Sequence, residues 1–112
     1  MTILSADYTN LDYEMMAKEI GLKPKHIPML IASFLEESQP IISSLKTAIE
    51  SNDYNTIGLH AHSIKGSAGN LRLNEVYEMS REMELAAKAD DSSFSYAAYL
   101  DAIMVAIATI KL

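Results

Sequence analysis

The sequence predicts an all-α protein, arranged as an antiparallel up-down four-helix bundle with a short additional N-terminal helix. Apolar residues recur at spacings of three and four along most of the chain, which is the period of an amphipathic helix. β-branched residues never alternate with polar ones over a useful length, so no strand is expected. Helix breakers are few, with 4 Gly and 3 Pro in 112 residues. Short connections between long amphipathic helices favour antiparallel neighbours.

The first two helices are predicted from their cap and breaker residues. A short helix is expected over 10–20, with Asn10 as its N-cap. A long second helix begins near Pro24, because a proline in the first turn costs no hydrogen bond. Pro40 lies within this second helix. We expect a kink or break near 38–39, since proline removes one hydrogen bond and clashes with the preceding turn.

Three further helices of similar length are predicted over 53–71, 74–89 and 94–110. Asp53 is the expected N-cap of the first of them. Methionines that recur at helical spacing are most often core side chains. We therefore assign four of them to the core: Met29, Met79, Met83 and Met104.

The composition limits the class of protein. Hydrophobic residues make up 49% and charged residues 21%, which is typical of a globular chain, and 112 residues indicate a single domain spanning 1–112. The absence of Cys excludes a disulfide scaffold and a thiol nucleophile. A formal net charge of −6 argues against nucleic acid as a partner. No apolar run is long enough to span a membrane and no signal peptide is visible, so we expect a cytoplasmic protein with no membrane contact.

The predicted helix over 53–71 has an unusual polar side. Its core stripe on a helical wheel comprises Ile57, Ala61, Ile64, Ala68 and Leu71. The far side carries Gly58, His62, Lys65, Gly66 and Gly69. Each glycine inside a helix costs roughly 0.5–1 kcal/mol relative to alanine. We interpret the glycines as clearing side chains from around His62, so that another protein can bring a reactive group close to the imidazole.

A plainer explanation of this polar side is structural. Glycines along one side of a helix also allow a close contact with a neighbouring helix or with a second copy of the chain in a dimer, and a single exposed histidine is usually just solvated. The lysine one turn after His62, together with the residues around both, favours the functional interpretation.

The residues around His62 spell A-H-S-I-K-G-S-A-G-N-L. This segment resembles the phosphoacceptor segment of histidine phosphotransfer (HPt) domains, whose pattern is roughly A-H-x-L-K-G-S-A-x-x-L-G. The matching residues are Ala61, His62, Lys65, Gly66, Ser67, Ala68 and Leu71. The resemblance extends over most of the chain, including Glu84 on the next helix. One departure is Arg72, which stands where the family commonly has Gly.

The resemblance implies a histidine-containing phosphotransfer protein of a two-component phosphorelay. His62 would accept a phosphoryl group from the aspartyl phosphate of a receiver domain and pass it to another receiver. Lys65 would offset charge on the phosphoryl oxygens, and Glu84 would orient the imidazole through its other ring nitrogen. The implied partner-binding residues are Gly58, Ser63, Gly66, Ser67 and Gly69.

The partner would be a receiver domain of a response regulator or hybrid kinase, and Mg²⁺ would be supplied by that receiver, with no cofactor bound by this domain. No Gly-rich nucleotide loop is present, so we expect a phosphocarrier without kinase activity rather than an enzyme. No two histidines have the i, i+4 spacing of a helical metal site, so no metal is expected. A carrier that exposes its histidine works as a monomer, which we expect here.

One alternative function stays open at the sequence level. The chain would then be a helical adaptor that binds a receiver or kinase without being phosphorylated. The intact histidine, lysine and glycine of the motif disfavour that alternative, because a degenerate adaptor would be expected to have lost one of them.

Overall fold

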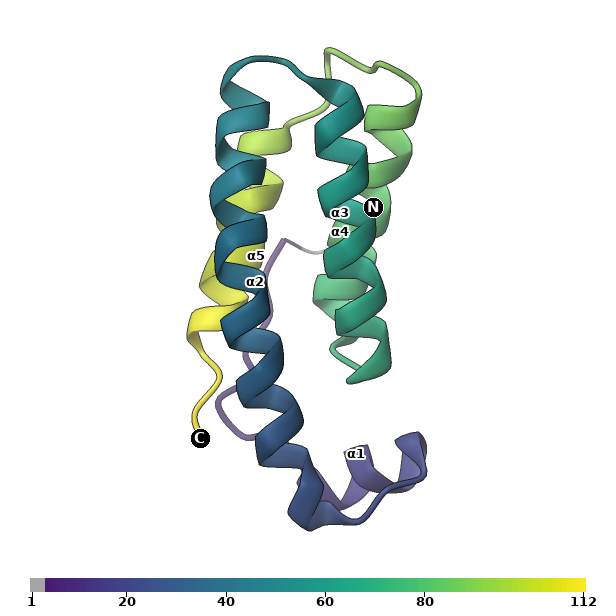
Figure 1. Cartoon of the computed structure of the whole chain (residues 1–112), viewed down its shortest axis with the longest axis vertical. Helices are drawn as coiled ribbons and strands as arrows, with labels where there is room; N and C mark the ends of the chain where they lie inside the picture. The colour runs from purple at the N-terminus through teal and green to yellow at the C-terminus, as the bar shows by residue number, and fades with distance from the viewer. Residues whose placement is uncertain (1–3) are drawn as a thin grey trace.

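The computed structural model describes residues 4–112, and all of their regular structure is helical (Figure 1). The elements are α1 (Tyr13–Ile20), a 3₁₀ turn η1 (Pro24–His26), α2 (Ile27–Glu50), α3 (Tyr54–Asn70), α4 (Asn74–Lys88) and α5 (Tyr96–Ala108). No strand occurs within the described range. The predicted all-α class is confirmed.

The four longer helices lie side by side, and the chain reverses direction at each connection between them (Figure 1). α2 and α4 each pack against both α3 and α5, so α3 and α5 lie diagonally opposite each other. α1 lies across one end of this group and contacts η1 and the start of α2. Fully buried side chains from all four long helices fill the centre, among them Ile31, Leu45, Ile57, Ile64, Met79, Met83 and Ile103.

Pro40 does not interrupt the second helix. α2 is continuous from Ile27 to Glu50, so of the kink or break predicted near 38–39, the break does not occur. Pro40 lies on the exposed side of the helix, where water can satisfy the carbonyl that loses its partner. Buried side chains on either side, Phe34 and Ile42, hold both halves of the helix against the core.

The helix starts agree with the sequence for α3 and differ for α1. Asp53 caps α3 as predicted, and its carboxylate accepts a hydrogen bond from the Thr56 N–H at 3.2 Å. α1 is capped by Asp12, whose carboxylate accepts from the Met15 N–H at 3.0 Å, and not by Asn10. Aspartate and asparagine are equally good caps, so their local preference does not decide between the two positions.

Two of the four methionines assigned to the core lie elsewhere. Met79 and Met83 are fully buried, as predicted. Met29 is 63% exposed and Met104 is 40% exposed, so their assignment to the core is wrong. Each of these two lies beside the buried stripe of its helix rather than on it. One residue corresponds to a rotation of about 100° around the helix, and the spacing of apolar residues alone does not resolve a shift of one residue.

Tyr8 holds the N-terminal segment against the helices. Its ring is buried, and its hydroxyl accepts a hydrogen bond from the Val76 N–H at 3.2 Å and donates to Glu75 Oε1 at 3.0 Å. Burial raises the pKa of Tyr8, so the phenol stays protonated. The residue at the N-cap of α4 is Leu73, which has no side-chain acceptor for the first turn. The Tyr8 hydroxyl supplies that acceptor from 68 residues away in the chain.

We predict that Tyr8→Phe destabilises the fold by about 1 kcal/mol. The substitution keeps the buried ring but removes the acceptor of a buried N–H in the first turn of α4. The loss is measured as a change in the free energy of unfolding in urea.

Tyr13→Phe is the matched control for this measurement. The Tyr13 hydroxyl makes one exposed hydrogen bond, 3.3 Å long, to the Lys111 carbonyl. Its removal should cost much less than the removal of the Tyr8 hydroxyl. Equal losses in the two variants would show that the Tyr8 hydroxyl does not cap α4.

Candidate functional site

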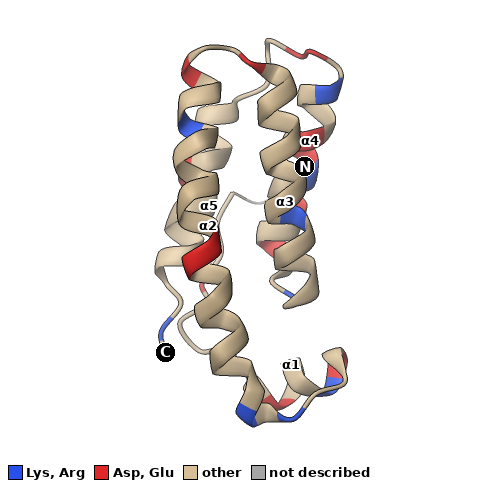
Figure 2. Ribbon diagram, viewed as in Figure 1, with Lys and Arg blue, Asp and Glu red and all other residues tan. Residues whose placement is uncertain are grey.

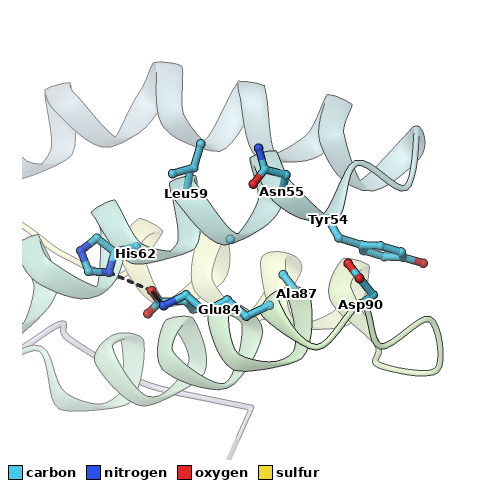
Figure 3. A pocket seen from close by; sticks show the side chains of 9 residues that line it. Tyr54, Asn55, Leu59, His62, Glu84, Ala87 and Asp90 are labelled. Atoms are coloured by element: carbon cyan, nitrogen blue, oxygen red, sulfur yellow. Dashed lines mark hydrogen bonds and ion pairs between the residues drawn. The ribbon is translucent and has the colours of Figure 1, made fainter.

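The candidate site lies where α3 faces α4, and its centre is a pairing of His62 with Glu84. His62 comes from the middle of α3, and its Nδ1 lies 2.8 Å from Oε2 of Glu84 on α4 (Figure 3). The two side chains differ sharply in exposure, with His62 65% exposed and Glu84 3% exposed. A solvent-facing imidazole is therefore held from below by a buried carboxylate.

Two lysines complete the environment of the buried carboxylate. Lys65 Nζ lies 2.7 Å from Oε1 of Glu84, and Lys88 Nζ lies 3.0 Å from Oε2. Burial alone would raise the pKa of Glu84, but the hydrogen bonds from Lys65, Lys88 and His62 together lower it to about 2. The carboxylate is thus ionised at neutral pH, with both oxygens occupied by donors.

The ionised carboxylate determines the tautomer of the imidazole. A carboxylate can only accept hydrogen bonds, so Nδ1 of His62 must carry the hydrogen that it donates to Glu84. In the neutral ring, the lone pair then resides on Nε2. Figure 3 places this second nitrogen on the side of the ring away from Glu84. The exposed edge of His62 therefore presents a nucleophilic nitrogen.

The three glycines on the polar side of α3 have different surroundings. At Gly66 an added Cβ would meet no atom within 4 Å, so this glycine leaves open space. Gly58 is buried, and its added Cβ would lie 3.7 Å from Cβ of Ala87. At Gly69 the added Cβ would lie 3.1 Å from the Tyr77 ring.

The expectation that all three glycines clear surface around the histidine is therefore wrong for Gly58 and Gly69. Both of them face α4. Only at Gly69 does the missing Cβ allow a closer approach, because at Gly58 an added Cβ would make an ordinary van der Waals contact. The wheel places these glycines opposite the core stripe, but α4 covers one flank of that side. Gly66 alone matches the expected bare position.

The two serines assigned to the partner surface lie in different surroundings. Ser63 is exposed, and its hydroxyl donates to the Leu59 carbonyl at 3.3 Å. Ser67 is half-buried and turns toward α2, where it lines a small cavity with Phe34 and Ile41. Ser63 is therefore on the open surface next to His62, whereas Ser67 lies between α3 and α2.

A groove of about 460 Å³ runs from His62 along the α3/α4 junction (Figure 3). It is lined by Tyr54, Asn55, Gly58, Leu59, His62, Glu84, Ala87, Lys88 and Asp90. Leu59 is 63% exposed and gives the groove an apolar edge. Leu59 was not predicted from the sequence, although its position three residues before His62 puts it on the neighbouring part of the same helix surface.

Lys88 is the residue of the charged cluster that sequence reasoning missed. Its spacing of four residues from Glu84 was a signal for an ion pair. On a helix rich in acidic residues, such a pair looks like an ordinary surface contact. The burial of Glu84 is what makes this pair part of the site, and burial is a property of the folded chain.

Arg72 occupies the turn between α3 and α4 with a left-handed backbone, φ 61°. Glycine adopts this conformation without strain, and other residues adopt it at some cost. The Arg72 side chain donates from Nη1 to the Gly69 carbonyl at 2.8 Å, and its Nε lies 3.7 Å from Oε2 of Glu19 on α1. The departure from glycine therefore keeps the turn and adds a link to α1.

Residues 4–112 contain no group of three or more His, Cys, Asp or Glu side chains placed to hold a metal ion. Within the same range, no helix has the length and apolar character needed to cross a membrane.

The model of the family described as Hpt domain matches residues 29–109, a range that contains His62, Lys65, Glu84 and Lys88. No curated protein and no solved structure matches the chain significantly.

We predict that Glu84 makes the stability of the fold depend on acid pH. Its pKa falls from 4.5 to about 2 on folding, so its contribution, of about 3 kcal/mol, is fully present above the unfolded pKa. As the pH falls from 4.5 toward 2, the unfolded state binds the proton first and this contribution is lost. Urea unfolding of the wild type and of Glu84→Gln across this interval measures the difference.

The control is Glu78→Gln, which removes an exposed carboxylate from the same helix. This variant should follow the wild-type stability across the pH interval. A Glu84→Gln variant that loses stability in acid as steeply as the wild type would contradict the assignment.

Proposed function

The chain belongs to the Hpt domain family, and we propose that it is a histidine-containing phosphotransfer protein with His62 as its phosphoacceptor. Hpt domains are phosphocarriers of phosphorelay signal transduction rather than enzymes. The observation that carries the assignment to His62 is its hydrogen bond to Glu84, 2.8 Å long, which leaves the exposed ring nitrogen with the lone pair. Transfer of a phosphoryl group to a histidine needs a nucleophilic ring nitrogen of this kind.

The proposed donor is the aspartyl phosphate of a receiver domain. The Nε2 lone pair attacks phosphorus, an N–P bond forms, and the P–O bond to the aspartate breaks to release a carboxylate. The ring retains its hydrogen on Nδ1 and thereby gains positive charge. Glu84, ionised and 3% exposed, lies 2.8 Å from that nitrogen and stabilises the charge. The reverse reaction passes the phosphoryl group to the aspartate of a second receiver.

The proposed roles of the lysines follow from their shared carboxylate. Lys65 is held by Glu84 at 2.7 Å, one turn from His62. An ammonium has three donors, so Lys65 retains hydrogens that can bind phosphoryl oxygens. Lys88 Nζ lies 3.0 Å from Oε2 of the same carboxylate and adds positive charge beside the groove. Phosphoryl transfer depends mainly on such positioning and charge stabilisation.

We take residues 1–112 as one cytoplasmic domain, an antiparallel up-down four-helix bundle, that binds no cofactor of its own. A receiver of a response regulator or hybrid kinase supplies Mg²⁺. The receiver docks over Gly66 and the exposed part of α3, with Leu59 as an apolar contact.

The adaptor alternative is disfavoured by Glu84. Removing a carboxylate from water is costly unless several donors compensate it. An adaptor that only binds a partner has no use for a buried charge that orients an exposed imidazole. The site retains that arrangement with His62 at its surface.

We predict that His62→Gln abolishes phosphoryl transfer from labelled receiver domains and leaves the fold intact. The wild type should acquire an acid-labile, base-stable label, as expected for a phosphohistidine. His60→Gln, which alters the neighbouring histidine of the same helix, should keep the wild-type label. A label that persists on His62→Gln would refute the acceptor assignment, and receiver binding without any label on the wild type would favour the adaptor.

We predict that Gly66→Leu weakens receiver binding about tenfold or more, equivalent to at least about 1.4 kcal/mol. The leucine side chain would stand in space that is open in the free protein, so the fold should be retained. Gly66→Ala should raise the free energy of unfolding by about 0.5–1 kcal/mol with a smaller effect on binding. Calorimetric titration and urea unfolding measure the two quantities, and unchanged affinity in Gly66→Leu would remove Gly66 from the docking surface.

A further inference from the structure

The last helix is apolar on nearly all sides. α5 has 13 residues, of which Asp101 alone is charged, and Figure 2 shows its ribbon as almost entirely tan. A helix that is apolar all round is normally buried all round. α5 buries one side against α2 and α4 and leaves the other side open. The open side carries Ala97, Ala98, Asp101, Met104, Val105 and Ala108.

Large apolar side chains stand in the middle of this open side. Val105 is 64% exposed and Met104 is 40% exposed. A shallow groove of about 180 Å³ continues from Met104 onto the last turns of α2, where Lys46 and Glu50 line it. We call the open side of α5 together with Lys46 and Glu50 the α5 face.

The charges of the α5 face are of both signs. Lys46, Glu50 and Asp101 are all exposed. Within residues 4–112, none of the three takes part in an ion pair. One cation and two anions thus border an apolar strip without partners in their own chain.

We propose that the α5 face binds the same face of a second copy of this chain, forming a twofold-symmetric homodimer. Twofold symmetry repeats every contact, so Lys46 of each copy pairs with Asp101 of the other, while Met104 and Val105 pack across the axis. Because the face carries both signs, a twofold axis through it brings unlike charges of the two copies opposite each other. A net charge of −6 on each copy opposes association, which makes these unlike pairs necessary.

The dimer leaves the candidate site accessible. α5 lies diagonally opposite α3 in the bundle (Figure 1), so pairing through the α5 face turns both copies of His62 outward. The dimer differs from the monomer expected from the sequence, because that expectation considered only access to the histidine. It does not depend on the proposed phosphotransfer.

Sedimentation equilibrium of the full chain, from micromolar to millimolar concentration, tests the proposal. The expected result is a mass that rises to twice the 12.4 kDa of one chain. Val105→Lys should hold the chain at the single mass, because it places a charge in the centre of the face. Met29→Lys, at a position of similar exposure on α2, should still dimerise. A wild type that stays at the single mass, or a Val105→Lys variant that dimerises normally, overturns the proposal.

A charge exchange tests the specific pairing. Lys46→Asp and Asp101→Lys should each weaken dimerisation about tenfold, since two attractions per dimer become repulsions. The variant that combines both substitutions should recover affinity close to that of the wild type. A double variant that is weaker than either single variant would show that Lys46 does not face Asp101, and circular dichroism checks that each variant keeps its helices.

Discussion

The buried carboxylate of Glu84 is the interaction on which the site depends. It leaves water only because three donors, from His62, Lys65 and Lys88, surround it, and an unpaired carboxylate in that position would destabilise the fold strongly. Two of these donors come from α3 and the acceptor comes from α4. The same contacts that stabilise the charge therefore fix the distance between the helices and the orientation of the imidazole. Structure and chemistry are coupled here through one side chain.

Glycine makes that coupling possible by setting how closely α3 and α4 approach. Gly58 lies against Ala87, and Gly69 lies against Tyr77. A Cβ at Gly69 would press on the Tyr77 ring, whereas at Gly58 a Cβ would make an ordinary contact and only a side chain larger than alanine would press on Ala87. Such side chains would push α4 outward and lengthen the hydrogen bonds that cross the junction. Gly66 has the opposite surroundings, open rather than packed, although all three glycines look alike on a helical wheel.

Periodicity was sufficient for the all-α class and for the presence of His62 on an exposed surface, because both depend on the angle between successive residues of one helix. It was insufficient wherever a second element decides the outcome. The flank of α3 that α4 covers determines the role of Gly58, and no wheel of α3 contains that information. The cap of α4 comes from Tyr8, which is distant in the sequence. Pro40 was expected to kink or break α2, but the helix continues through it, because buried side chains on both sides of the exposed proline pack against the core.

Tyr8 gives the N-terminal segment a thermodynamic connection to the site. Its hydroxyl binds the start of α4, and its own N–H donates to Thr109 Oγ1 at 2.8 Å, just beyond the end of α5. The segment before α1 therefore joins the same cooperative unit as the helix that carries Glu84. Proteolytic clipping before α1, or a tag that displaces Tyr8, would uncap α4 and increase local opening along it. Amide exchange in α4 would then respond to changes made at the opposite end of the chain.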